Sequence, residues 1–243
     1  MIGVQLPLSV QLPDAAGFEN FHAGPNAAVV AALRQAAAGD APSSILLHGA
    51  PGSGKTHLLQ ALSRAAGRHG RRAAYLPLES FAQQQPAALA GFEAFELLCL
   101  DDIGAAVLDR AWALALLRLV DAVHARGGRC VFGTAAAPGA LPRAPLPDLR
   151  TRLAACAVFG LKPLAEADLC ALLRLRAAAR GLELPPEVAQ FLLHRLPRDV
   201  PGLLGALDLL DRGSLSAQRR LTIPFVQQQL SGAVLPGAQT VPG

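Results

Sequence analysis

The stretch Gly49-Ala-Pro-Gly-Ser-Gly-Lys-Thr56 follows the pattern G-x-x-x-x-G-K-[ST] without deviation. It comes directly after the apolar run 44–48 and directly before a helix-like run that starts at His57. In this pattern the glycines let backbone N–H groups converge on phosphate oxygens, the lysine adds a charge, and the last hydroxyl reaches Mg²⁺. The helix that follows adds the positive end of its dipole. The stretch therefore predicts a phosphate-binding P-loop in a nucleotide-binding protein.

The predicted ligand is ADP or ATP with Mg²⁺, held by the loop and the start of its helix. Lys55 is one of two lysines in the chain, the other being Lys162, among 22 basic residues. A chain that otherwise uses arginine thus has a lysine at the position where the pattern requires it. Thr56 is also a predicted Mg²⁺ ligand. The predicted nucleotide-binding residues are Gly49, Ala50, Pro51, Gly52, Ser53, Gly54, Lys55, Thr56 and His57.

Two adjacent acids, Asp101 and Asp102, follow the apolar run 96–100. P-loop proteins hold Mg²⁺ with an acid at the carboxyl end of such a strand. We therefore predict that Asp101 is a metal ligand and that Asp102 is catalytic and orients the attacking water, although its side chain is one carbon shorter than that of glutamate. The alternative is a pair of aspartates that cap a loop, and the P-loop upstream favours the metal site.

Short apolar runs alternate with helical stretches between Phe18 and Pro163. This alternation predicts an α/β fold in which a five-stranded parallel sheet is flanked by helices on both faces. The run 96–100 is apolar throughout, as expected for a central strand buried on both faces. The predicted strands lie near 44–48, 73–77, 96–100, 129–133 and 156–160, and the predicted helices near 26–38, 55–67 and 108–126.

After Pro163 the pattern changes to amphipathic helices without strands, which predicts a small all-helical domain. Its helices are expected near 165–180, 185–195, 201–211 and 222–230. The last residues are rich in glycine, proline and small side chains, which predicts a flexible tail. The expected organisation is an extended arm at 1–13, an α/β domain at 14–163, a helical domain at 164–231 and the tail at 232–243.

Composition excludes several classes of protein. No apolar stretch is long enough to span a membrane, and the N-terminus lacks the layout of a signal peptide, so we expect a cytoplasmic protein without membrane contact. The four cysteines are widely spaced, which favours buried reduced thiols over disulfides or a zinc site. The net charge is +4, but the arginines are spread along the chain. Their densest group, Arg68-His-Gly-Arg71-Arg72, is interpreted as a solvated loop rather than a phosphate-binding patch.

The motifs together resemble the AAA+ ATPases, and within them the replication initiator DnaA. The resemblance rests on Gly17-Phe-Glu-Asn-Phe21, Gly24-Pro-Asn26, Thr56-His-Leu-Leu59 and Leu100-Asp-Asp-Ile103. It implies an AAA+ P-loop NTPase whose helical domain is a lid. No helix-turn-helix segment follows the expected lid, which disfavours direct sequence-specific DNA binding.

The chain further resembles the Hda family, the regulatory inactivators of DnaA. Members carry an N-terminal peptide that docks on the replicative sliding clamp, and Gln5-Leu-Pro-Leu-Ser-Val10 is similar to it. In an extended arm, Gln5 would be a hydrogen-bonding anchor, while Leu6, Leu8 and Val10 would fill apolar pockets. The C-terminal part resembles the family at 181–185, 208–212 and 216–226.

The resemblance also assigns a catalytic role to Arg152, which matches the family's arginine finger. It implies a negative regulator of replication initiation that binds the clamp, the beta subunit of DNA polymerase III, and promotes hydrolysis of the ATP bound to DnaA. Contact with DNA would then be mainly indirect, through the clamp. Neighbouring Arg150 is interpreted as a surface residue.

Two positions depart from the DnaA pattern. Ala135 stands where an acidic residue is expected, with only Thr134 beside it, and Pro201 stands where a nucleotide-sensing arginine is expected, with Arg198 nearby. We therefore expect weak or no intrinsic ATP hydrolysis. The sequence leaves open whether ADP or ATP is the resting ligand and whether the chain forms a homodimer. It also leaves open a self-standing AAA+ ATPase, such as a helicase loader or a transposition helper.

Overall fold

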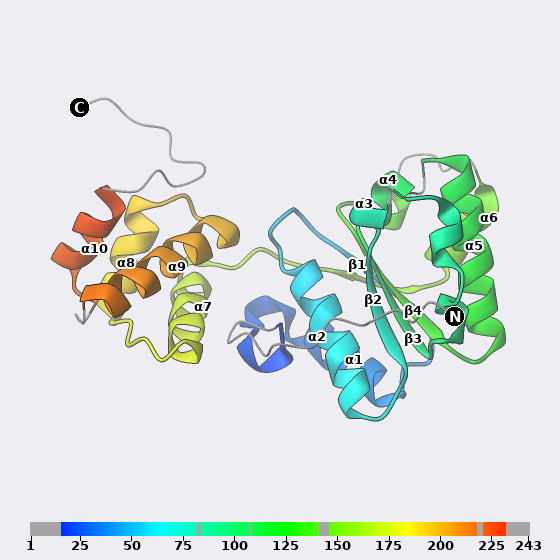
Figure 1. The fold of residues 1–243 in the computed structure, drawn as a ribbon, viewed down its shortest axis with the longest axis horizontal. Helices are drawn as coiled ribbons and strands as arrows, with labels where there is room; N and C mark the ends of the chain where they lie inside the picture. Colours follow the sequence, from blue (N-terminus) through cyan, green and yellow to red (C-terminus); the bar gives the residue numbers. More distant parts are fainter. Residues whose placement is uncertain (1–15, 82–83, 107, 141–145, 218–220, 232–243) are drawn as a thin grey trace.

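The computed structural model describes residues 16–81, 84–106, 108–140, 146–217 and 221–231. Within them a sheet with flanking helices is followed along the chain by helices alone (Figure 1). The predicted arm at 1–13 and tail at 232–243 lie outside the described residues, and so do the predicted clamp-binding residues Gln5, Leu6, Leu8 and Val10.

The five predicted strands are all present and form one parallel sheet. They are ordered β2-β3-β4-β1-β5, so that β1 lies between β4 and β5. Ile45 pairs with Val131 on one side and with Ala157 on the other, so the amino ends of these three strands lie at the same end of the sheet. The strands are β1 (Ile45–His48), β2 (Ala73–Pro77), β3 (Leu97–Asp101), β4 (Arg129–Thr134) and β5 (Ala157–Gly160).

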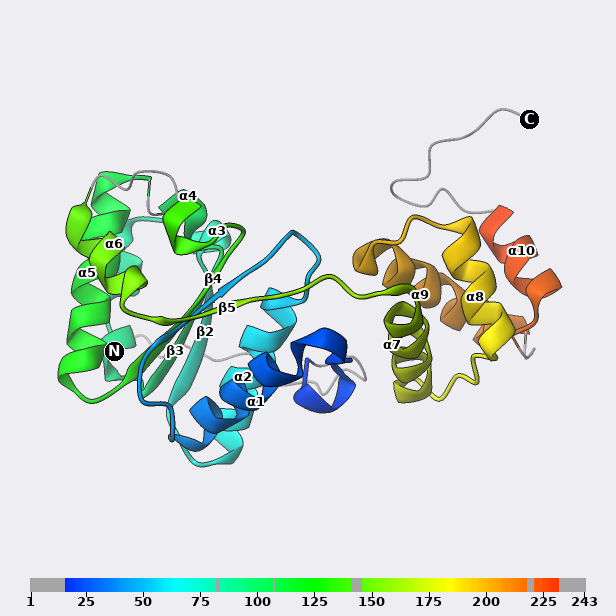
Figure 2. The same ribbon diagram turned by 180° about the vertical axis from the view of Figure 1, so that it is seen from behind.

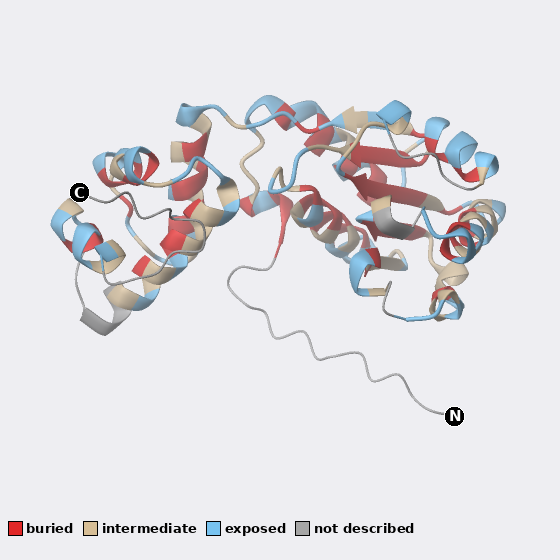
Figure 3. Cartoon of the chain, turned by 90° about the horizontal axis from the view of Figure 1, so that it is seen from above, coloured by how far each residue is buried: buried red, intermediate tan, exposed pale blue. Residues whose placement is uncertain are grey.

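Each face of the sheet is covered by helices, and alternate strand residues face the two layers. Helices α1 (Ala27–Ala38) and α2 (Lys55–Arg68) lie on one face, while α5 (Arg110–Ala125) and α6 (Pro147–Ala154) lie on the other (Figure 2). Because both faces are covered, the central strands are apolar at consecutive positions and appear buried along their length (Figure 3). The sequence prediction of an α/β fold is confirmed.

Several short elements were not predicted from the sequence. They are α3 (Leu78–Phe81), α4 (Ile103–Ala106), α6 and five 3₁₀ turns, at Phe18–Asn20, Gly24–Asn26, Pro86–Leu89, Phe92–Ala94 and Pro138–Ala140. Apart from α6, each has three or four residues, which is too short to show a helical period.

The C-terminal helices form a separate apolar cluster of their own. They are α7 (Glu166–Ala179), α8 (Pro186–Arg195), α9 (Val200–Ala217) and α10 (Ile223–Ser231). Helix α9 continues to Ala217 instead of ending near 211, because Gly213 is tolerated inside a helix that packs against α10. All four cysteines are free thiols; Cys99, Cys130 and Cys156 are buried as predicted, whereas Cys170 is only partly buried. None of the described helices is long and apolar enough to cross a membrane.

Candidate nucleotide-binding site

The predicted P-loop joins the carboxyl end of β1 to the start of α2. Gly52 and Gly54 have φ values of 75° and 96°, in the left-handed region that favours glycine. The loop also has close neighbours, since a Cβ added at Gly52 would lie 2.9 Å from Pro201 Cδ. A Cβ added at Gly54 would lie 2.8 Å from Phe21 Cε2. These glycines therefore serve both the turn and the packing around it.

Two polar groups inside the loop fit a polyphosphate. Lys55 is buried, with 7% of its surface exposed, and its Nζ donates to the carbonyls of Gly49 at 2.8 Å and Ala50 at 3.1 Å. The Ser53 hydroxyl is buried and has no hydrogen-bond partner among the described residues. A buried hydroxyl without a partner is costly, so a ligand oxygen that reached it would relieve that cost. The amides at the start of the 14-residue helix α2 add the positive end of its dipole.

Asp101 is the last residue of β3 and is buried, with 2% of its surface exposed. Its Oδ2 accepts a hydrogen bond from the Tyr75 hydroxyl at 2.9 Å, and its Oδ1 accepts one from the Asp102 amide at 3.1 Å. A Cβ added at Gly133 on β4 would lie 2.5 Å from Oδ1. Burial, followed by the Asp101 carboxylate, raises the pKa of the Tyr75 phenol, so the hydroxyl remains a donor. The carboxylate is thus fixed from three sides.

Asp102, the predicted catalytic acid, has a φ of 52° and is the one described residue other than glycine with a positive φ. Aspartate tolerates this conformation better than most residues, and such strained positions cluster at functional sites. The Asp102 side chain is exposed beside the buried Asp101. Partial desolvation of its carboxyl, followed by the negative charge of Asp101, raises the pKa of Asp102.

The predicted Mg²⁺ ligands fit a metal that is shared with a nucleotide. Thr56 is exposed at the first turn of α2, and the Asp101 carboxylate lies at the end of β3, so both supply oxygen atoms. Among the described residues there is no cluster of three or more His, Cys, Asp or Glu side chains that could hold a metal ion. Mg²⁺ is commonly bound by one or two protein groups together with phosphates, which is what these two residues allow.

The departures from the DnaA pattern lie beside the P-loop. Thr134 ends β4, is buried, and its carbonyl accepts the Gly49 N–H at 3.2 Å, while Ala135 next to it offers no polar side chain. On the lid, Pro201 lies against Gly52 in the first turn of α9. Arg198 forms an ion pair with Glu166 at 3.0 Å. In the described structure the arginine of the segment 198–201 is thus paired within the lid.

Residues 17–22 cross the start of α2, an arrangement that was not predicted. His57 Nε2 hydrogen-bonds the Gly17 carbonyl at 2.9 Å, and the His57 ring lies 5.5 Å from the Phe21 ring. His22 Nε2 lies 2.9 Å from Asp168 Oδ1 on α7, so the same segment also contacts the lid. These contacts give His57 a packing role, and its predicted contact with the nucleotide stays a prediction. The only sequence signal for this segment is the DnaA-like run 17–21.

Arg152 lies at the opposite end of the sheet from the P-loop. It is near the end of α6, which leads into the amino end of β5, whereas the P-loop follows the carboxyl end of β1. The two strands are parallel and in register, so the end of α6, just before β5, lies at the opposite end of this strand pair from the P-loop. Arg152 Nε forms an ion pair with Asp121 Oδ1 on α5 at 2.8 Å, and the two side chains are 51% and 46% exposed.

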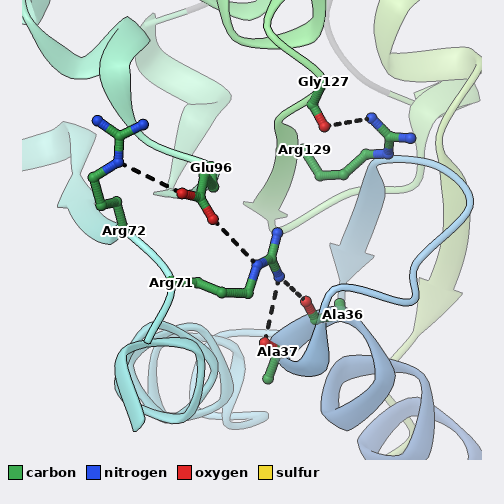
Figure 4. Close-up of polar contacts among 7 residues, drawn as sticks. All are labelled: Ala36, Ala37, Arg71, Arg72, Glu96, Gly127 and Arg129. Atoms are coloured by element: carbon green, nitrogen blue, oxygen red, sulfur yellow. Dashed lines mark hydrogen bonds and ion pairs between the residues drawn. The ribbon is translucent and has the colours of Figure 1, made fainter. Parts of the chain in front are cut away.

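Two arginines of the densest group, Arg71 and Arg72, are engaged in structural contacts, as Figure 4 shows. Arg71 Nη1 donates to the Ala36 carbonyl at 2.6 Å and so satisfies the end of α1, and its Nε lies 3.6 Å from Glu96. Arg72 shares the same carboxylate at 3.5 Å. The interpretation of this group as a loop rather than a phosphate-binding patch is consistent with these contacts.

Two protein-family models match this chain. A model described as an AAA ATPase domain matches residues 27–181, which is more than half of the chain. The chain belongs to the AAA ATPase family. A second model, described as the lid domain of Hda, matches residues 166–230. The resemblance to Hda-like, DnaA-related AAA+ proteins is therefore confirmed.

Solved structures share this fold. Domain III of DnaA from Thermotoga maritima superposes with a TM-score of 0.80 at 21% identity, covering 92% of this chain and 98% of that one. AMPPCP-bound DnaA from Aquifex aeolicus gives 0.70 at 20% identity, over 85% of this chain and 68% of that one. The Holliday junction branch migration motor RuvB from Thermotoga maritima gives 0.64 at 16% identity, over 84% and 67% of the two chains. At these identities the likeness is one of fold.

Proposed function

We propose that this chain is a nucleotide-bound adaptor that docks on the DNA sliding clamp and stimulates hydrolysis of DnaA-bound ATP, with Arg152 acting in trans. It would thereby restrain replication initiation. The Hda lid domain supports this role. The observation that carries the proposal is the position of Arg152, which is exposed at the end of the sheet opposite to the chain's own P-loop.

The proposed role of Arg152 follows from guanidinium chemistry. A planar guanidinium offers five N–H donors and keeps its charge at any physiological pH. Placed against the γ-phosphate of an ATP on a neighbouring molecule, it stabilises the charge that develops during hydrolysis. Arginine fingers supplied by a second protein accelerate hydrolysis by about 10³- to 10⁵-fold in well-studied GTPases.

The chain's own nucleotide, ADP or ATP, has a structural role in this proposal. Loop amides, Lys55 and Ser53 would hold its phosphates, and Thr56 and Asp101 would hold Mg²⁺, which would neutralise phosphate charge. Asp102 would orient water near the phosphates. With Ala135 and Pro201 at the two sensor positions, turnover would be slow, and the bound nucleotide would mainly stabilise the arrangement of lid and P-loop.

The test of the finger is a comparison of two arginines on α6. Arg152→Ala is expected to abolish stimulation of DnaA ATP hydrolysis in the presence of DNA-loaded clamp. Arg150→Ala is the matched control, because Arg150 is exposed on the same helix and is expected to leave stimulation unchanged. Stimulation by Arg152→Ala at the wild-type level would remove the finger from the proposal.

The proposed clamp contact is made by Gln5, Leu6, Leu8 and Val10, in a peptide-in-groove mode. A double substitution, Gln5→Ala with Leu6→Ala, is expected to abolish binding to purified clamp. Arg152→Ala should bind the clamp as wild type does, because its position is distinct from the arm. Clamp binding that survives the double substitution would show that another surface is used.

The second candidate is a self-standing AAA+ ATPase that acts as a homo-oligomer. The paired acids favour it, because Asp102 is held in a strained conformation beside the buried Asp101, as is common at catalytic sites. Its signature would be a basal ATP turnover typical of an AAA+ motor, lost in Lys55→Ala and independent of DnaA and clamp. Negligible basal turnover with strong DnaA-dependent stimulation would favour the adaptor.

A further inference from the structure

The ion pair between Arg152 and Asp121 engages only one edge of the guanidinium. The short contact is between Arg152 Nε and Asp121 Oδ1, at 2.8 Å. Among the described residues, the two terminal nitrogens of Arg152 have no hydrogen-bond partner. The carboxylate therefore occupies the inner edge of the guanidinium and leaves its outer donors available to a ligand.

The backbone of Arg152 is fixed independently of this ion pair. Leu149 and Leu153, on the same helix, are buried in the core between α5, α6 and the sheet. The Arg152 carbonyl also accepts a hydrogen bond from the Cys156 thiol at 3.4 Å. Helix α6 thus has a defined position, and what remains to be fixed is the long arginine side chain.

A long exposed arginine samples many rotamers, and each one that points away from the ligand reduces the competent population. A carboxylate on Nε selects rotamers in which the terminal nitrogens extend past it. Such an exposed pair contributes little to folding stability. Its effect is therefore expected in the action of Arg152 and not in the stability of the chain.

We propose that Asp121 is the positioning residue for Arg152. By holding Nε it presents the terminal nitrogens to the phosphates of a nucleotide bound by a partner protein. The inference rests on the proposed function of Arg152 as a finger in trans. It goes beyond that function by assigning a residue on a different helix that sets the geometry of the finger.

The experiment measures stimulation of DnaA ATP hydrolysis as a function of the concentration of this chain, with DNA-loaded clamp present. Asp121→Ala is expected to lower maximal stimulation by about three- to tenfold, the effect of releasing one rotamer-rich side chain. The concentration for half-maximal stimulation should remain unchanged, because Asp121 does not touch the partner in this proposal. Asp121→Asn, which keeps an oxygen acceptor, should restore part of the loss.

The matched control is Glu166→Ala. Glu166 pairs with Arg198 at 3.0 Å, and its side chain is 44% exposed, so the pair resembles that of Asp121 in distance and exposure but lies on the lid. It is expected to leave maximal stimulation unchanged. Thermal midpoints should shift by no more than about 2–4 °C in either variant, since exposed ion pairs contribute little.

The two single variants separate the finger from its support. Asp121→Ala should retain reduced stimulation, whereas Arg152→Ala should retain none. Wild-type stimulation by Asp121→Ala, together with its loss in Arg152→Ala, would overturn the inference and leave the proposed function standing. Increased stimulation, or a changed half-maximal concentration alone, would also overturn it. Wild-type stimulation by Arg152→Ala would instead overturn the proposed function itself.

Discussion

The two ends of the sheet differ in how their key side chains are held. At the carboxyl ends of the strands, Lys55 and Asp101 are buried and each is bonded by two neighbouring groups. At the amino ends, Arg152 is half exposed and held by one ion pair. Buried, fully bonded groups are suited to a ligand that the chain binds by itself, whereas an exposed donor is suited to a site that a partner completes.

The largest expected effect comes from removing the charge at the buried end. Lys55→Ala should weaken ADP and ATP binding by roughly 10- to 100-fold, because charge-assisted hydrogen bonds to phosphate are lost. Lys162→Ala is the control, since it removes the other lysine, whose side chain is exposed. Titration with a fluorescent nucleotide measures the nucleotide affinity of both variants. Equal affinity for Lys55→Ala and wild type would contradict the assignment of the P-loop as the binding site.

Gly133 tests how tightly the buried end is packed. A Cβ at this position would lie 2.5 Å from Asp101 Oδ1 and 2.9 Å from Leu59 Cδ1. Gly133→Ala should therefore lower the free energy of unfolding by about 1–3 kcal/mol through overpacking. Gly205 lies inside α9 with open space around it, so Gly205→Ala should raise stability by about 0.5–1 kcal/mol. Urea denaturation measures the free energy of unfolding of both variants. An unchanged free energy of unfolding in Gly133→Ala would mean that Asp101 can move freely.

Tyr75 tests whether the Asp101 carboxylate depends on its hydrogen bonds. Tyr75→Phe deletes the hydroxyl that donates to Oδ2 at 2.9 Å and should cost about 1–2 kcal/mol in unfolding free energy. It should also weaken nucleotide binding in the presence of Mg²⁺ while leaving Mg²⁺-free binding unchanged. An equal loss with and without Mg²⁺ would indicate that Tyr75 acts on the loop and not through Asp101.

The sequence predicted the sheet well because its signals are local. Each strand is a short apolar run bounded by polar residues, and the P-loop pattern locates the turn that follows β1. Asp101, the last residue of β3, and Asp102, which follows it, were likewise found from their position at the end of an apolar run. What these signals share is that they can be read within a few neighbouring residues.

The supports of the site could not be predicted, because they come from distant parts of the chain. Tyr75 reaches Asp101 across a pair of strands, and Asp121 reaches Arg152 between two helices. Gly133 offers a weak signal, since a glycine inside a strand often marks a close approach. Asp121 offers none, because a carboxylate on an exposed helix face resembles any other.

The smallest expected effect concerns two histidines, one at each end of the sheet, and the dependence of folding stability on pH. Burial lowers the pKa of His57, beside the P-loop, and of His124, at the amino ends of the strands, where its Nε2 lies 2.7 Å from Ser44 Oγ. The unfolded chain therefore takes up protons on these rings more readily than the folded chain. Their contribution to stability is present above pH 6.5 and is lost as the pH falls from 6.5 through the lowered folded pKa.

Urea midpoints at about pH 7.5 and pH 5.5, on either side of the ordinary histidine pKa, measure this loss. We expect the wild type to be less stable at the lower pH, and His57→Gln and His124→Gln each to show a smaller difference between the two. Replacing a histidine of the exposed segment after α2, His69→Gln, should leave the difference unchanged. Since His57 is the more deeply buried ring, its substitution should reduce the pH dependence more than that of His124. The reverse order would mean that the amino ends of the strands exclude water more strongly than the P-loop end, against the comparison drawn from Lys55 and Arg152.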